Sequence, residues 1–122
     1  MIKPLVDDRK YRVIKLTNNL EALLISDVNT SRCSASMSVG VGSFQDDDDV
    51  LGLAHFTEHM IFLGSKTYPR PGEFEEHLSN YFGLTNAFTE DEKTTFYFDV
   101  GCRGFQKSLI MFSRMFAEPL FD

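Results

Sequence analysis

The sequence predicts an α+β protein, a two-layer α/β sandwich in which a mostly antiparallel sheet carries its helices on one face. Three observations support this fold class. Strand-like and helix-like segments follow one another in the order βββααββα, and the polar connections between strands suit hairpins. Residues 31–41 alternate apolar with small polar side chains, as a strand with one buried face does. Residues 105–118 have apolar side chains at helical spacing, and Pro119 comes directly after them.

The N-terminal region is expected to contain three strands. The first two cover residues 11–16 and 21–26, and the polar residues between them, which include Asn18 and Asn19, are typical of a hairpin turn. The third strand covers residues 31–41, with its apolar side chains on the core side and its serines on the other face.

Residues 51–63 follow as a helix, because Asp49 can cap its N-terminus and Gly64 can end it. Apolar residues surround most of the circumference of this segment, which predicts a buried helix. A polar face on a buried helix would need partners for its side chains.

The C-terminal half adds two helices and two strands. Residues 73–82 form a helix, and its His77 is expected to be exposed among glutamates. Residues 84–89 and 94–100 form two strands around a polar turn, and residues 105–118 form the last helix.

Composition excludes several classes of function. The chain has 122 residues, 43% hydrophobic content and a net charge of −6, so it is at most one domain, with enough apolar residues for a core. An acidic chain without a basic cluster is a poor candidate for nucleic acid or an anionic membrane. The run Asp46–Asp49 is either a solvated loop or a site that favours basic residues in a substrate.

The expected location is cytoplasmic, because no signal peptide and no long apolar segment is visible in the sequence. Cys33 and Cys102 lie far apart in the sequence, so they are expected to be two reduced thiols.

The most informative motif is His-Phe-Thr-Glu-His at residues 55–59. On a helix, His55, Glu58 and His59 share one face. Two imidazoles at this spacing can hold one Zn²⁺, and the glutamate can reach a water molecule beside it; H-x-x-E-H is the signature of inverzincin peptidases. The alternative is an ordinary helix whose histidines make common hydrogen bonds.

Three blocks of sequence resemble the pitrilysin-type (M16-like) zinc metallopeptidases, and within them the branch of insulin-degrading enzyme and nardilysin. The blocks run from Gly42 to Pro69, from Asn86 to Val100, and from Phe116 to Phe121, in the order found in that family. The resemblance covers nearly the whole chain. It implies an enzyme several times larger, built from repeated α/β units that enclose a chamber and cut short peptides.

The resemblance also implies roles for individual residues. His55 and His59 would be zinc ligands, and Glu58 the general base that takes a proton from the attacking water. An extended peptide would add to the strand that contains Asn86. The residues that match substrate-binding positions of the family are Phe62, Asn86, Ala87, Phe88 and Tyr97. Core packing remains an equal alternative for Phe62 and Tyr97.

In the family the third zinc ligand is a glutamate on a later helix, beyond the last residue of this sequence. Residues 1–122 are therefore expected to be an incomplete N-terminal catalytic domain, whose partners are peptide substrates and the remaining domains of the full-length enzyme. Whether it forms a homo-oligomer stays open. The other hypothesis is a non-catalytic module of 122 residues that binds a peptide or a full-length relative.

Overall fold

The computed structural model describes residues 3–121, and the chain divides into two compact units, Met1–Ser31 and Arg32–Asp122. The first unit is an antiparallel hairpin of β1 (Lys10–Lys15) and β2 (Glu21–Ser26), with Lys10 opposite Ser26. The turn is closed by the Leu16 N–H, which donates to the Leu20 carbonyl at 2.8 Å, and Asn19 adopts a positive φ of 67°. The predicted hairpin is confirmed, with its first strand shifted by one residue.

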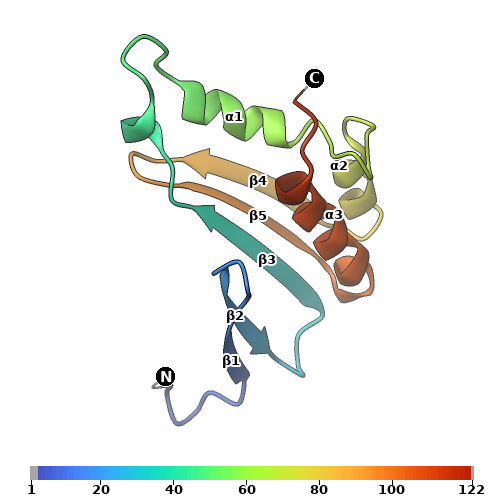
Figure 1. The fold of residues 1–122 in the computed structure, drawn as a ribbon. Helices are drawn as coiled ribbons and strands as arrows, with labels where there is room; N and C mark the ends of the chain where they lie inside the picture. Colours follow the sequence, from blue (N-terminus) through green and yellow to red (C-terminus); the bar gives the residue numbers. More distant parts are fainter. Residues whose placement is uncertain (1–2, 122) are drawn as a thin grey trace. The chain divides into compact units, whose positions relative to one another are not determined.

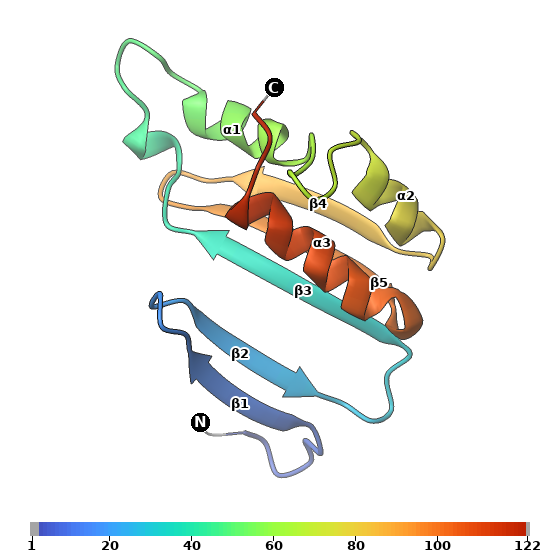
Figure 2. The same ribbon diagram turned by 45° about the vertical axis from the view of Figure 1, so that its right-hand side comes forward.

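The second unit is built on a three-stranded antiparallel sheet in the order β3-β5-β4. Its strands are β3 (Arg32–Val39), β4 (Leu84–Thr89) and β5 (Thr94–Gly101). The helices α1 (Leu53–Ile61), α2 (Glu73–Ser79) and α3 (Phe105–Ala117) cover one face of this sheet (Figures 1 and 2). The predicted α+β class is therefore confirmed, and the predicted elements of this unit are present with small shifts at their ends.

The core of the second unit lies between β5 and the helices. Phe96, Phe98 and Val100 alternate along β5 and are almost fully buried, because they point toward the helical layer. The Phe98 and Phe112 rings meet edge to face with centroids 5.2 Å apart, which ties α3 to the sheet. The remaining buried apolar residues of this core are Ile61, Phe74, Leu78, Met111 and Met115.

Burial of α1 differs from the prediction. Of the nine residues of α1, only Glu58 and Ile61 are buried, while Leu53 and Phe56 are exposed. The apolar circumference of this segment led to the expectation of a buried helix. In this structure one side of α1 packs on β4 and β5, and the other sides face outward.

His77 also differs from the prediction. It is 9% exposed, because it lies on the side of α2 that faces α3 and Tyr81. Its Nε2 atom is 3.4 Å from the Gly104 carbonyl oxygen. The exposure of His77 could not be inferred from the glutamates next to it in the sequence, because adjacent residues on a helix point in different directions.

The expectation of two reduced thiols is wrong in this structure, which joins Cys33 and Cys102 in a disulfide. Cys33 pairs in register with Val100, and Cys102 follows β5 by one residue, so the two Cα atoms are 5.1 Å apart. A separation of 69 residues in sequence hides this proximity.

Gly42 lies where the segment after β3 crosses the β4–β5 turn. The Ser43 N–H donates to the Glu90 carbonyl at 2.9 Å, and the Phe44 N–H donates to the Asp91 carbonyl at 2.8 Å. A Cβ atom on Gly42 would lie 2.2 Å from the Glu90 carbonyl oxygen. Only glycine fits this crossing without moving the backbone.

Gly42→Ala is therefore expected to lower the free energy of unfolding by roughly 3 kcal/mol, the upper part of the usual range for overpacking, because the new atom meets backbone rather than a flexible side chain. Urea denaturation measures this change. The matched control is Gly40→Ala, since a Cβ there meets nothing within 4 Å. Equal stability of the two variants would contradict the prediction.

Candidate metal centre

The acidic loop before α1 fixes where that helix begins. Asp46 accepts hydrogen bonds from the main-chain N–H groups of Gly52 at 2.7 Å and Ala54 at 2.8 Å. The expected cap, Asp49, does not accept either of these bonds, and its own N–H donates to the Asp47 side chain. One residue of the acidic run therefore orients the helix that carries the motif.

The two histidines of the motif meet at the exposed side of α1. His55 and His59 lie one helical turn apart, and their Nε2 atoms are 3.1 Å apart. Two arrangements fit this separation. One ring can donate an N–H···N bond to the other, or both lone pairs can point at one ion.

The distance between the two nitrogens suits zinc. Nitrogen ligands at Zn–N distances of about 2.0–2.1 Å and a tetrahedral angle lie roughly 3.3 Å apart. The observed 3.1 Å between the His55 and His59 nitrogens is close to this value. The residues present therefore fit the zinc ion that the motif predicts, as two of its ligands.

Glu58 lies behind the imidazoles, on the sheet side of α1. It is 7% exposed, and its Oε2 accepts a hydrogen bond from Thr89 Oγ1 at 2.5 Å. Donor atoms of His55, Glu58 and His59 all lie within 4.8 Å of one another. Within residues 3–121 this is the one group of three or more metal-binding side chains that could hold an ion.

Thr89 is a site residue that the sequence did not reveal. It is the last residue of β4 and reaches α1 across 31 positions of sequence. Thr94 Oγ1 lies 3.5 Å from the Thr89 hydroxyl oxygen and donates to the Val41 carbonyl at 2.8 Å. The one signal in the sequence is alternation along residues 84–89, which puts Thr89 on the same face as Ala87.

The five predicted substrate-binding residues divide between the two faces of the sheet. Asn86 and Tyr97 are directly opposite in register on the face away from the helices, and the Phe88 ring lies 6.5 Å from the Tyr97 ring between centroids. These three residues are brought together.

Phe62 and Ala87 lie on the helical face instead. Phe62 follows α1 and packs on Phe96, with ring centroids 5.9 Å apart, and Ala87 is opposite Phe96 in register. Both are partly buried against the core. The sheet therefore separates them from Tyr97.

β4 is an edge strand among the described residues, because β5 is its one partner in the sheet order. Edge strands present unpaired main-chain groups to which another strand can add. The Ala87 N–H is already occupied, since it donates to Asn86 Oδ1 at 2.9 Å.

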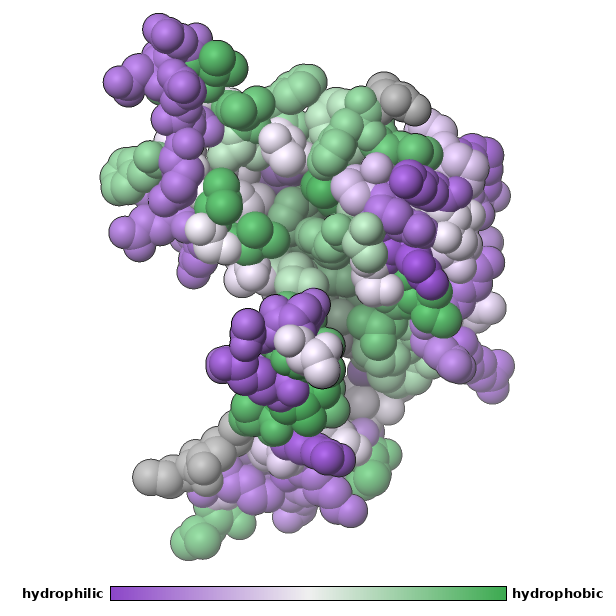
Figure 3. Space-filling view, in the orientation of Figure 1, coloured by the Kyte–Doolittle hydropathy of each residue, from purple (hydrophilic) through white to green (hydrophobic). Residues whose placement is uncertain are grey.

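The candidate site borders a hollow of the second unit. An apolar hollow of about 480 Å³ in the second unit has Leu53, Ile61, Phe96 and Phe116 in its wall. Figure 3 shows the green, apolar side chains that gather between α1 and the C-terminal end of α3. Glu58 is one of the five polar residues that line this hollow, together with Gln45, Asp46, Thr57 and Thr94.

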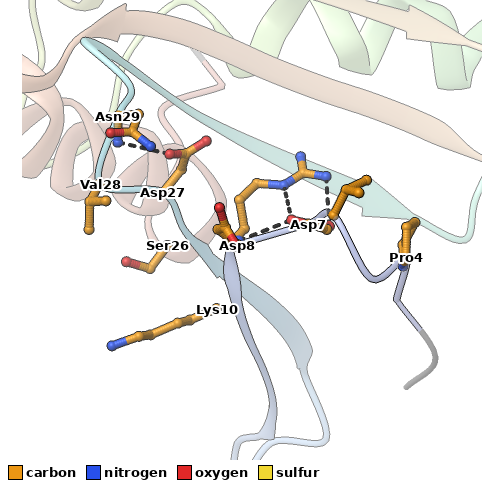
Figure 4. Close-up of a pocket in the computed structure, with 10 residues that line it drawn as sticks. Pro4, Asp7, Asp8, Lys10, Ser26, Asp27, Val28 and Asn29 are labelled. Carbon is orange, nitrogen blue, oxygen red and sulfur yellow. Dashed lines mark hydrogen bonds and ion pairs between the residues drawn. The ribbon is translucent and has the colours of Figure 1, made fainter.

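The second hollow, also about 480 Å³, belongs to the hairpin unit and is lined by residues that include Asp7, Asp8, Lys10 and Asp27 (Figure 4). Hydrogen bonds from Arg9, and a further one from the Tyr11 hydroxyl, hold the pKa of the Asp7 carboxyl well below its usual range. Because this carboxylate is already bonded to Arg9 and Tyr11, it gives no indication of a ligand-binding site.

None of the described helices has the length and apolarity needed to cross a membrane. A family model described as "Insulinase (Peptidase family M16)" matches residues 21–122. The chain is 46% identical over 120 residues to "Insulin-degrading enzyme-like 1, peroxisomal" of Arabidopsis thaliana, covering 98% of this chain and 12% of the relative. It is 45% identical over 116 residues to human insulin-degrading enzyme, covering 95% of this chain and 11% of the relative.

Among solved structures, a crystal structure of pitrilysin aligns with a TM-score of 0.96 and 36% identity, over 99% of this chain and 13% of that one. The chain thus spans about one eighth of the length of these two relatives and of pitrilysin.

Proposed function

The chain belongs to the insulinase family, peptidase family M16, and from this premise we propose that it is the zinc-binding N-terminal part of a metalloendopeptidase that cleaves short peptides. The observation that carries the proposal is the meeting of two imidazole nitrogens, 3.1 Å apart, in front of a buried carboxylate.

His55 and His59 would hold the ion through their Nε2 atoms, at the exposed side of α1. When bound, zinc supplies a Lewis acid that polarises a peptide carbonyl. Glu58 would act as the general base. Thr89 occupies its Oε2 atom, so Oε1 is left to accept a proton from the attacking water.

The free edge of β4 would bind the substrate as an added strand, with main-chain hydrogen bonds that depend little on sequence. Asn86, Phe88 and Tyr97 could then contact side chains of the peptide on one face of the sheet. Phe62 and Ala87 would act from the other face, at the end of α1. The Asn86 side chain must release the Ala87 N–H if a peptide is to use that donor.

Completion of the site would need a third ligand and the remaining domains of a longer enzyme, since the chain corresponds to 12% of its relatives. Two ligands alone hold zinc weakly, so the 122-residue chain by itself is expected to lack peptidase activity. The alternative function is that of a non-catalytic module. Such a module would bind a peptide or a partner at the same β4 edge and would not cleave it.

The compartment remains a prediction. The sequence predicts the cytoplasm, the name of one relative states a peroxisomal location, and the Cys33–Cys102 disulfide is of a kind that is rare in reducing compartments.

The zinc site is tested by titrating Zn²⁺ into the purified chain. We expect one weakly bound ion per chain, and loss of this binding in the His55→Ala, His59→Ala double variant. His77→Gln is the matched control, because it removes the third histidine, which lies on α2 and outside the site. Zinc binding that is unchanged in the double variant would show that the site assignment is wrong.

A further inference from the structure

The carboxylate of Glu58 is attached to the sheet and does not lie free beside the imidazoles. Thr89 Oγ1 donates to Glu58 Oε2 at 2.5 Å, across the packing of α1 on β4 that is visible in Figure 1. Both histidines are exposed, whereas Glu58 is buried. The motif therefore points in two directions, with its imidazoles outward and its carboxylate inward.

This separation matters because a glutamate beside two histidines is itself a good third zinc ligand; the His₂Glu set is common in zinc enzymes. A carboxylate oxygen that binds the metal is no longer free to accept a proton from water. The donor atoms of tetrahedral zinc lie roughly 3.3 Å apart. The histidine nitrogens meet this distance, but the set that includes Glu58 spreads to as much as 4.8 Å.

We propose that Thr89 is a positioning residue that holds Glu58 away from the metal and so keeps it available as a base. This inference rests on the proposed zinc site of His55 and His59. The Thr89 hydroxyl is the donor of this bond, because an ionised carboxylate oxygen can only accept. The neighbouring Thr94 donates its own proton to the Val41 carbonyl at 2.8 Å.

The test compares Zn²⁺ affinity and the visible absorption of bound Co²⁺ for the 122-residue chain and four variants. In Thr89→Val the hydroxyl is lost and the shape is kept, so Glu58 is free to turn and bind the ion. We expect roughly tenfold tighter Zn²⁺ binding and an altered Co²⁺ spectrum, because Glu58 would then complete a His₂Glu set of three protein ligands.

Thr89→Ser keeps the hydroxyl and is expected to restore the behaviour of the original chain. Thr85→Val is the matched control, because it removes a hydroxyl from the same strand whose partner is the Tyr97 carbonyl, 2.8 Å away. The double variant Thr89→Val, Glu58→Gln should lose the gain in affinity, since the added ligand is then absent. Circular dichroism shows whether each variant is folded.

The outcomes separate the two proposals. Tighter binding in Thr89→Val alone supports the positioning role. Equal affinity and equal spectra in Thr89→Val and the original chain overturn it and leave the zinc site standing. Metal binding that does not depend on His55 and His59 overturns the proposed function, and this inference with it. If Thr89→Val does not fold, Thr89→Ala, which also lacks the hydroxyl, takes its place, and affinity and spectra equal to those of the original chain in that variant also overturn the role.

Discussion

Glu58→Gln is expected to lower kcat/KM for peptide cleavage by about 10²–10⁴-fold, the contribution of a general base. The measurement needs a complete enzyme, so we would replace the matching 120 residues of the Arabidopsis thaliana relative with this chain and follow a quenched fluorescent peptide. Glutamine keeps the size of the side chain and can still accept a hydrogen bond from Thr89, but it cannot take a proton from water.

The control for this prediction is Glu76→Gln in the same chimera. Glu76 is exposed on α2 and pairs with Arg70 at 2.6 Å, so its loss removes a carboxylate far from the proposed chemistry. Zinc content should be the same in both variants, because Glu58 is not proposed as a ligand. Full activity of the Glu58→Gln chimera would contradict the role of Glu58 as the base, and an inactive parent chimera would favour the non-catalytic alternative.

Cys33→Ser is expected to lower the free energy of unfolding by about 4 kcal/mol. The disulfide closes a loop of 69 residues, and the loss of loop-closure entropy in the unfolded chain gives an effect of this size. Because small proteins are usually stable by about 5–15 kcal/mol, this one cross-link would supply a large part of the total. Urea denaturation of the oxidised chain and the variant measures the difference.

The control is a reductant. Reducing the original chain should lower its stability to that of the double variant Cys33→Ser, Cys102→Ser, while the double variant itself should not respond. A mass increase of about 2 Da on reduction reports the bond directly, since each sulfur gains one hydrogen. An original chain whose stability and mass do not change on reduction would show that the disulfide does not form.

The order and boundaries of the elements could be predicted from the sequence because they depend on local patterns. Alternation along residues 31–41 gave a strand, and apolar spacing in residues 105–118 gave a helix, both within two residues of the observed ends. The meeting of the two histidines of the motif could also be predicted without tertiary information, because residues four apart on a helix lie about one turn apart. That turn alone brings His55 and His59 to a separation of 3.1 Å between nitrogens.

Predictions that depended on neighbours distant in sequence were less successful. The sequence pattern cannot tell which side of a helix meets the sheet, so the burial of α1 and the exposure of His77 were both wrongly predicted. The cap of α1 was assigned to Asp49 on sequence proximity, whereas the loop brings Asp46 to the helix. The Cys33–Cys102 pair needed the antiparallel register of β3 and β5.

The sequence by itself therefore determined the family, the α+β class and the three residues of the motif, because each of these depends only on residue identity and local spacing. The tertiary structure alone decided which way each of the three residues faces. Packing of α1 on β4 buries Glu58 against Thr89 and leaves the two imidazoles exposed. Contacts across 31 residues of chain are set by how strands and helices pack, and no local pattern records them.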